Sequence, residues 1–276
     1  MSRPERPRAG ATGRISIGAN AGVLSVEALR AVVERFGVAE AQVRRDHAIS
    51  HVLWAISNQM ADAVIFFGGT AVSRTHLVHA RLSEDIDLIA TGPRRDVAGQ
   101  LVRALDRTLR RTLGRPRWNP GLSDQSDVAP GVLEVGDDIA IKVQLLDGRH
   151  YAKWPVERRV LEQRYADAFP AELTVPTVES FVGWKTAAWH DRGAARDLYD
   201  LWALAEEGHF TAEAAKLFAQ HGTTGGPPRE FMFTKAPPET VWRDQLAGQT
   251  RLKITAAGAL AVVRAAWAAA LGEDWE

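Results

Sequence analysis

The strongest constraint on the fold lies in residues 66–90, FFGGTAVSRTHLVHARLSEDIDLIA, where a double glycine and two acidic residues stand close together. The apolar run AVIFF has the length and composition of a buried strand, and it ends directly at Gly68 and Gly69. Further on, apolar residues alternate with Asp85 and Asp87, which predicts a second strand with one buried and one polar face. The segment therefore predicts a strand, a glycine turn, a helix, and then a strand that carries two carboxylates.

These residue types at this spacing favour a site for metal and phosphate. On a strand, residues i and i+2 project from the same face roughly 7 Å apart, so Asp85 and Asp87 can present both carboxylates to one site. Magnesium is commonly held by one or two carboxylates and substrate phosphates, and two such ions can stabilise both oxygens of a nucleotidyl transfer. Gly68 and Gly69 would let backbone N–H groups cradle a triphosphate at a helix that begins near Thr70, which would cap that helix or contact a phosphate.

Each element also has an ordinary structural explanation. An Asp-x-Asp pair at a strand end is usually a solvated edge, and a lone Gly-Gly is most often a turn. It is their conjunction, with strand character beside each, that favours a nucleotide site. Ser83 is assigned to the same site, although a serine there is normally a turn or capping residue. Its phosphorylation would place negative charge beside Asp85 and weaken magnesium or nucleotide binding.

Periodicity organises the rest of the chain. Apolar residues at helical spacing predict helices at 22–36, 42–60 and 96–113. Two alternating apolar runs about a Gly136-Asp137 turn predict a β-hairpin at 131–148, with sheet content ending near Gly148. From Thr177 onward nearly every window favours helix. We expect a disordered tail at 1–20, a core with N-terminal helices at 21–160 and a helical C-terminal domain at 175–276.

Composition excludes several classes of protein. The absence of cysteine excludes disulfides and thiolate zinc sites, and no apolar run reaches the ~18 residues of a membrane span. The Pro- and Gly-rich start lacks the apolar core of a secretory signal, so we expect a cytoplasmic protein with no membrane contact. The 34 basic and 34 acidic residues balance, so any nucleic-acid surface must be a local patch.

The arginine face of the helix at 96–113 is the best candidate for such a patch, although most charged helical faces are merely solvated. The candidate RNA contacts are Arg103, Arg107, Arg110 and Arg111. His76 and His79 have helical spacing but no evident third ligand, so zinc is not expected there. Trp184, Trp189 and Trp202 are expected in the core rather than as base-stacking platforms.

Four segments, in order, carry a resemblance to one family. FFGGTAVSRTHLVHARLSEDIDL resembles a Phe-Lys-Gly-Gly-Thr-Ala-Leu motif followed by Arg-x-Ser-x-Asp-Ile-Asp-Leu. A preceding helix with an Asp-Tyr pair is matched by VRRDHAISHVLWAI. A later lysine and Arg-Asp-x-x-Asp-Leu segment is matched by WKTAAWHDRGAARDLYDLWAL, and a Trp and Gln pattern near the end is matched by VWRDQLAGQ. All four are features of the AbiEii/AbiGii toxin family of nucleotidyltransferases, and the resemblance spans roughly residues 43–250.

The resemblance implies an α+β fold: a polymerase-β-like nucleotidyltransferase core with a mixed sheet, followed by an α-helical C-terminal domain. Members of the family are toxins of toxin–antitoxin or phage-defence systems, and some transfer nucleotides to transfer RNA. It thus implies an enzyme that uses two Mg²⁺ ions and an NTP. The implied acceptor is RNA, with transfer RNA as the leading candidate, and the modification would block translation. The implied partner is a cognate antitoxin protein. Transfer to a protein or small molecule, and a catalytically weak nucleotide-binding module, are the alternatives.

Carried over residue by residue, the resemblance implies that Gly69 and Thr70 contact phosphate and that Asp85 and Asp87 bind magnesium. It implies that Lys185 and Asp197 are the remaining catalytic residues, supported by Arg196 and Asp200. From the residues alone, Lys185 could be an ordinary surface lysine, and Asp197 could orient Lys185 or Arg192 or serve in a structural ion pair. Two positions depart from the family. Phe67 replaces a lysine before the glycines, and Gln144 stands where a third acidic residue is expected.

Overall fold

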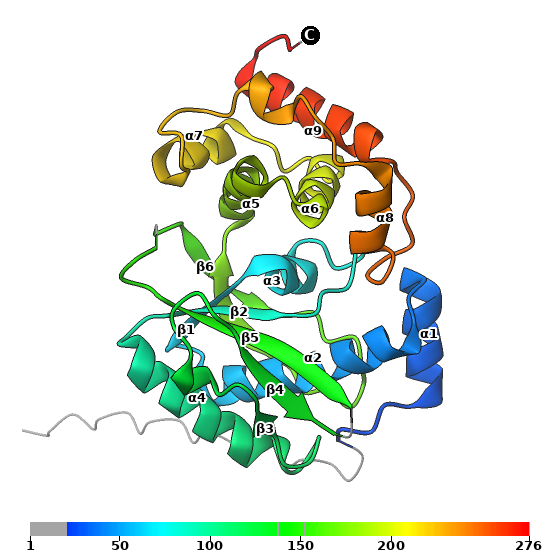
Figure 1. Cartoon of the computed structure of the whole chain (residues 1–276), viewed down its shortest axis with the longest axis vertical. Coiled ribbons are helices and arrows are strands. Elements are labelled where there is room, and N and C mark those ends of the chain that lie inside the picture. The colour runs from blue at the N-terminus through cyan, green and yellow to red at the C-terminus, as the bar shows by residue number, and fades with distance from the viewer. Residues whose placement is uncertain (1–20, 137, 152, 276) are drawn as a thin grey trace, which may run out of the picture.

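The computed structural model describes residues 21–136, 138–151 and 153–275 (Figure 1). Its helices are α1 (Val26–Phe36), α2 (Glu40–Met60), α3 (Gly68–Thr75), α4 (Arg94–Leu109), α5 (Val178–Arg192), α6 (Ala195–Glu206), α7 (Ala212–His221), α8 (Glu239–Leu246) and α9 (Ala256–Leu271), with short 3-10 helices at Leu122–Asp124 and Glu230–Phe233. Its strands are β1 (Val64–Phe67), β2 (Ile86–Ala90), β3 (Arg117–Trp118), β4 (Gly131–Val135), β5 (Ile139–Asp147), β6 (Val156–Val160) and β7 (Glu172–Pro176). The expected tail at 1–20 and Asp137 of the expected turn lie outside the described residues.

The strands form a single mixed sheet in the order β3-β4-β5-β2-β1-β7-β6. The pairs β1–β7 and β2–β5 are parallel, and the other neighbours are antiparallel. The mixed sheet and the helices confirm the expected α+β class, and the antiparallel β4–β5 pair confirms the hairpin predicted at 131–148.

The expectation that sheet content ends near Gly148 is wrong, because β6 and β7 extend the sheet to Pro176. β6 has the sequence VERRV, and its residues alternate between exposed and half-buried. A strand at the edge of a sheet needs no continuous apolar run, and its charged side chains protect the open edge. The sequence of β6 therefore carries little of the alternation by which a half-buried strand is recognised.

Helices cover both faces of the sheet. α2 and α4 pack against one face, whereas α3 and the C-terminal helices lie on the other side (Figure 1). Leu53 and Ile56 of α2 are fully buried, because this helix is enclosed by the sheet, α4 and α1. No helix in the described part of the chain is long and apolar enough to cross a membrane.

Hydroxyl side chains begin four of the helices and fix where each one starts. Ser25 accepts a hydrogen bond from the backbone N–H of Ala28, and threonines cap α5, α7 and α9 in the same way. The cap of α5 is Thr177, directly after β7 ends at Pro176. The chain therefore passes from the sheet into the helical part within two residues, which places α5 beside the turn at Gly68 and Gly69.

Candidate active site

The double glycine directly follows β1 and forms the turn that opens α3. α3 begins at Gly68, two residues before the expected start near Thr70. Gly68 has a φ of 80°, and a Cβ there would lie 2.0 Å from a carboxylate oxygen of Asp87. A Cβ on Gly69 would lie 2.7 Å from the Arg81 guanidinium. The positive φ and the nearby carboxylate favour glycine at position 68, whereas a Cβ at position 69 would require the Arg81 side chain to shift.

The two aspartates lie where the alternation placed them. Asp87 pairs with Phe67 across the β1–β2 ladder, and Asp85 directly precedes β2. Ile86 and Leu88, which alternate with the two aspartates along the chain, are fully buried in the core. Burial raises the pKa of Asp85, and burial followed by repulsion from Asp85 raises the pKa of Asp87 to about 6. Nearby basic groups, Lys142 and Arg196 at Asp85 and Lys185 and Arg192 at Asp87, oppose these shifts without outweighing burial, so a bound cation would stabilise the charged forms of both carboxyls.

Gln144 of β5 stands beside the acidic pair. It is in register with Asp87 in the parallel β2–β5 ladder, so the two side chains share a face of the sheet, as the sequence predicts. Its Nε2 donates a hydrogen bond of 2.7 Å to the Val128 carbonyl, which leaves the amide oxygen as its ligand-type atom. A neutral amide therefore occupies the position where a third carboxylate would complete the acidic set.

Thr70 and Ser83 lie close to these carboxylates. Thr70 is buried and its hydroxyl donates to the backbone carbonyl of Asp85, so it ties α3 to the start of β2 and does not cap the helix. Ser83 is also buried, and its Oγ would lie 3.2 Å from a Cβ on Gly69. Nucleotide contacts by these two residues stay predictions.

Lys185 is an ion-paired, buried residue and not an ordinary surface lysine. Its Nζ on α5 lies 3.0 Å from Asp197 Oδ1 and 2.7 Å from Asp200 Oδ2, both on α6. Arg192 Nε lies 2.6 Å from the other oxygen of Asp197, so this carboxylate orients both candidate cations. Burial opposes ionisation of Asp197, but Lys185 and Arg192 outweigh it and hold the pKa of Asp197 at about 2.

Arg81 is a site residue that sequence reasoning missed. It is buried, and its Nε and Nη2 donate to the two carboxylate oxygens of Asp200 at 2.7 and 2.8 Å. Its Nη1 donates to Gln249 Oε1 at 2.7 Å. Both residues fall within the matched segments, Arg81 as the first residue of RLSEDIDL and Gln249 as the last of VWRDQLAGQ. No pattern in the sequence shows that these two segments touch.

A polar cavity of about 250 Å³ joins the acidic pair to α5 and α6. Its acidic lining residues are Asp85, Asp87 and Asp197. Its basic lining residues are Arg81, Lys142, Lys185, Arg192 and Arg196. Arg81, Lys185 and Arg192 are paired with Asp197 or Asp200, whereas Lys142 and Arg196 lie beside the acidic pair, so the cavity offers both positive and negative charge. Such a lining suits an anionic ligand that brings its own cation.

A second cavity, of about 440 Å³, adjoins the first and shares Gly69, Asp87 and Lys185 with it. Aromatic rings line its other part: Phe67 and Trp184 stack with centroids 4.9 Å apart, and Trp154 stacks on Trp184 at 5.7 Å. Trp184 is half-buried and packs against the small core cluster of Phe67, Ile89 and Leu146, and it also lines this cavity.

Trp189 lies in the core as expected, and Trp202 is partly buried against it. The two remaining groups of candidates lie apart from the cavities. α4 ends at Leu109 instead of the expected residue 113, so it carries Arg103 and Arg107, while Arg110 and Arg111 follow it. α4 packs on the opposite face of the sheet from α3, and none of these four arginines lines either cavity. His76 lies 3.7 Å from Glu157, whereas His79 contacts Arg35, so the two histidines have different partners.

The fold and the site define a class of enzyme. A mixed sheet that presents an acidic pair to a glycine turn, with helical cations facing both, is the arrangement expected of a nucleotidyltransferase. Residues 52–273 match the family described as the nucleotidyl transferase AbiEii toxin of type IV toxin–antitoxin systems. The chain belongs to this family of nucleotidyltransferase toxins, whose members use an NTP and a divalent metal, and the family implies an antitoxin partner.

Solved structures of other proteins share the fold. MenT4, a nucleotidyltransferase toxin from Mycobacterium tuberculosis H37Rv, has a TM-score of 0.65 and 23% identity over 89% of this chain and 90% of its own. A candidate nucleotidyltransferase from H. pylori has a TM-score of 0.52 and 15% identity over 84% of this chain and 96% of its own. No curated protein sequence matches the chain.

The contact between Gly68 and Asp87 predicts that Gly68→Ala destabilises the fold by about 3 kcal/mol or more, because the new Cβ overlaps the carboxylate in addition to straining a positive φ. The matched control is Gly114→Ala, since Gly114 has a φ of 81° with nothing within 4 Å of a Cβ. It should cost only about 1 kcal/mol. Urea unfolding measures both, and equal losses would show that Asp87 does not constrain the turn.

The low pKa of Asp197 predicts a pH-dependent contribution to stability. A carboxylate whose pKa falls from about 3.9 unfolded to about 2 folded contributes about 2–3 kcal/mol, present above pH 4 and lost as the pH falls toward 2. Asp197→Asn should therefore destabilise strongly at pH 7 and roughly half as much at pH 3, as measured by denaturant unfolding. The exposed Asp244→Asn control should show little effect at either pH. A pH-independent loss at Asp197 would contradict the charge assignment.

Proposed function

We propose that this enzyme transfers a nucleotide from an NTP to an RNA acceptor, with transfer RNA as the expected acceptor, in a Mg²⁺-dependent cytoplasmic reaction that blocks translation. The observation that carries the proposal is the position of Asp85 and Asp87, between a glycine turn and a cavity lined by five basic side chains. An isolated acidic pair would attract only a cation, and an isolated basic cavity only an anion. Side by side they favour a metal–triphosphate complex.

The residues present fit magnesium. Asp85 and Asp87 offer hard oxygen ligands that are partly exposed, and a bound cation would offset the burial that raises the pKa of both carboxyls. Two Mg²⁺ ions, when bound, would stabilise charge on the attacking and leaving oxygens. Asp85 and Asp87 would hold them, and the backbone N–H groups that begin α3 would face the phosphates.

Positive charge for the triphosphate would come from the helices. Phe67 provides no cation next to the glycines, whereas Lys185 and Arg192 border both cavities. Because Lys185 is already paired with two aspartates, its ammonium is held in one place and would contact phosphate without reorganising. We therefore propose that Lys185 positions the triphosphate and that Asp197 fixes Lys185.

The aromatic cavity offers a place for the nucleobase. Phe67, Trp184 and Trp154 present stacked rings next to the glycine turn, and a base–aromatic contact is sequence-tolerant because every base has a π-face. The acceptor RNA would approach the polar cavity past Lys142 and Arg196. The α4 arginines could contact the same RNA only beyond an edge of the sheet, so we propose them as a secondary surface.

The metal assignment predicts that Asp85→Asn and Asp87→Asn each abolish transfer, lowering the rate by about a thousandfold or more while the fold stays intact, because each removes metal-binding charge. Asp62→Asn, at a side chain that is 99% exposed, is the matched control and should retain full activity. The assay follows labelled NTP with purified enzyme and Mg²⁺, and circular dichroism verifies the fold. Unchanged turnover by either folded variant would exclude the two-metal role.

The acceptor is identified by incubating the enzyme with each labelled NTP and total cellular RNA, then separating RNA from protein. Label in RNA of transfer-RNA size supports the proposal. Label confined to protein would indicate a protein-directed transferase. Binding of NTP with no label in any fraction would indicate a weak nucleotide-binding module, the alternative that Gln144 makes worth testing.

The register of β2 with β5 predicts that Gln144→Glu tightens Mg²⁺ binding, because it adds a hard oxygen ligand and a negative charge beside Asp87. If phosphate fills the same space, the added charge repels it and the rate falls despite tighter metal binding. Magnesium titrations of transfer measure both effects. Gln100→Glu, at an exposed position of α4, adds the same charge elsewhere and should leave the titration unchanged. Identical curves for wild type and Gln144→Glu would place residue 144 outside the metal site.

A further inference from the structure

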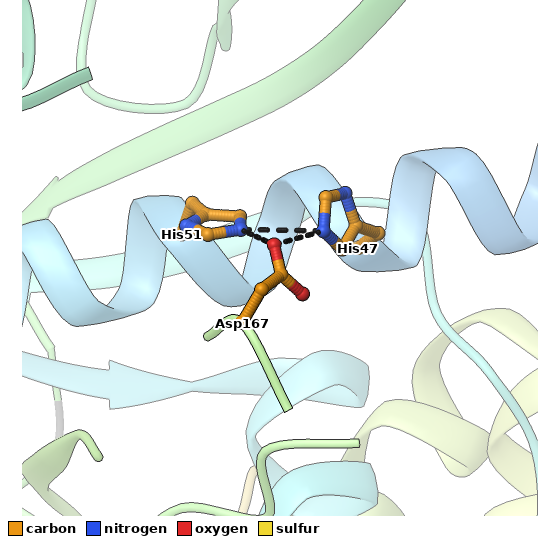
Figure 2. Close-up of side chains that lie close together, drawn as sticks. All are labelled: His47, His51 and Asp167. Atoms are coloured by element: carbon orange, nitrogen blue, oxygen red, sulfur yellow. Dashed lines mark hydrogen bonds and ion pairs between the residues drawn. The ribbon is translucent and has the colours of Figure 1, made fainter. Parts of the chain in front are cut away.

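A second group of metal-type ligands lies outside the active site. His47 and His51 stand one turn apart on α2, and Asp167, in the segment between β6 and β7, reaches toward both (Figure 2). Both histidines are buried and the Asp167 side chain is 13% exposed. None of the three lines the cavities of the active site. Within the described residues this is the group of histidine and carboxylate side chains with converging donor atoms.

The spacing of the three donor atoms matches the edges of a zinc tetrahedron. Asp167 Oδ2 lies 2.9 Å from His47 Nε2 and 3.1 Å from His51 Nε2, and the two nitrogens are 3.3 Å apart. Zinc–nitrogen and zinc–oxygen bonds of about 2.0–2.2 Å place neighbouring tetrahedral ligands roughly 3.3 Å apart. One ion above this triangle would therefore reach all three atoms with little movement of the side chains.

Hydrogen bonding alone accounts poorly for the same arrangement. Asp167 Oδ2 also lies 3.0 Å from the backbone N–H of Gly22, so one oxygen faces three nitrogens. A carboxylate oxygen has two lone pairs and cannot accept three separate N–H groups well. With an ion in place, Oδ2 would give one lone pair to the metal and the other to Gly22, and both imidazoles would bind through unprotonated Nε2 atoms.

We propose that His47, His51 and Asp167 form a binding site for one Zn²⁺ ion, with water as the fourth ligand. Two imidazoles and one carboxylate suit zinc, whereas magnesium prefers oxygen ligands alone. The site is thus distinct in chemistry and in place from the acidic pair Asp85 and Asp87, and it does not depend on the proposed function.

The position of this site assigns the ion a structural role. It would fasten the segment between β6 and β7 to α2, at a point where Tyr165 of that segment donates a 2.9 Å hydrogen bond to Asp46 Oδ2. Asp46, next to His47, accepts at its other oxygen from Arg74 of α3 at 2.8 Å. Zinc would therefore stabilise the buried contacts that support the helix of the glycine turn.

The test uses the full chain without an affinity tag, since polyhistidine tags bind zinc. After chelation and dialysis, the protein should bind one equivalent of Zn²⁺ in a competition titration with a chromophoric chelator, and a hundredfold excess over Kd should raise the unfolding midpoint by about 5 °C or more. Co²⁺ should give a visible absorption spectrum of tetrahedral type. His47→Ala and His51→Ala should lose the tightly bound equivalent of Zn²⁺ and the Co²⁺ spectrum, while His190→Ala, at an exposed position, should retain both.

Two further variants keep the test decisive. If an alanine variant fails to fold, Asp167→Asn preserves the size and an acceptor oxygen, and it should weaken zinc binding at least tenfold. Asp87→Asn should still bind one equivalent of Zn²⁺, which would distinguish this zinc ion from any metal ion bound at the active site. The proposal is overturned if the wild-type chain binds no zinc at micromolar concentrations, or if folded His51→Ala binds it as tightly as wild type.

Discussion

The rest of the structure depends on a set of buried ion pairs that joins the sheet to the helices. Arg81, Lys185, Asp197 and Asp200 are all at most 8% exposed, and each carries a full charge that costs several kcal/mol to bury unless it is paired. Every one of the four contacts a partner of opposite charge, and Asp200 contacts both Arg81 and Lys185. Separating α5 and α6 from the loop before β2 would leave these charges unpaired in the interior. The distance between the acidic pair and the helical cations is therefore fixed by the cost of breaking the network, about 3–5 kcal/mol for a single pair.

A second buried network fixes α3 from its other end. Arg74 is fully buried between the carboxylate and carbonyl of Asp46 and the carbonyl of Glu162, and Tyr165 holds the second carboxylate oxygen. The first network reaches the start of the same helix, since the Arg81 guanidinium would lie 2.7 Å from a Cβ on Gly69. Because both ends of an eight-residue helix are held by buried polar groups, its N-terminal N–H groups are aimed before any ligand binds. Such preorganisation is what an electrostatic site needs, since the site then does not have to reorient when charge develops.

Local sequence signals predicted much of this arrangement, and contacts between distant segments account for the rest. The strand, glycine turn and acidic strand were predictable because period and turn chemistry act over a few residues, as was the pairing of Lys185 with Asp197 across adjacent helices. β6 was not predicted because a charged edge strand lacks apolar periodicity, and β7, which lies inside the sheet, is a short strand of five residues that ends at Pro176. Arg81 and Gln249 are 168 residues apart, and Asp167 lies 120 residues from His47, so no spacing rule connects them. Helical periodicity places Trp184 against the core but does not reveal that this half-buried side chain also lines a cavity.

The charges around Gln144 determine how metal would enter the proposed reaction. Two carboxylates and an amide form a weak site for a free divalent cation, and burial together with repulsion from Asp85 already raises the pKa of Asp87. A third carboxylate would raise that repulsion further. A triphosphate supplies the missing anionic oxygens, and the surplus of basic residues in the cavity offsets its charge. The amide at position 144 thus favours a metal ion that arrives together with the nucleotide over one held by the protein alone, because only the complex satisfies both the carboxylates and the cations.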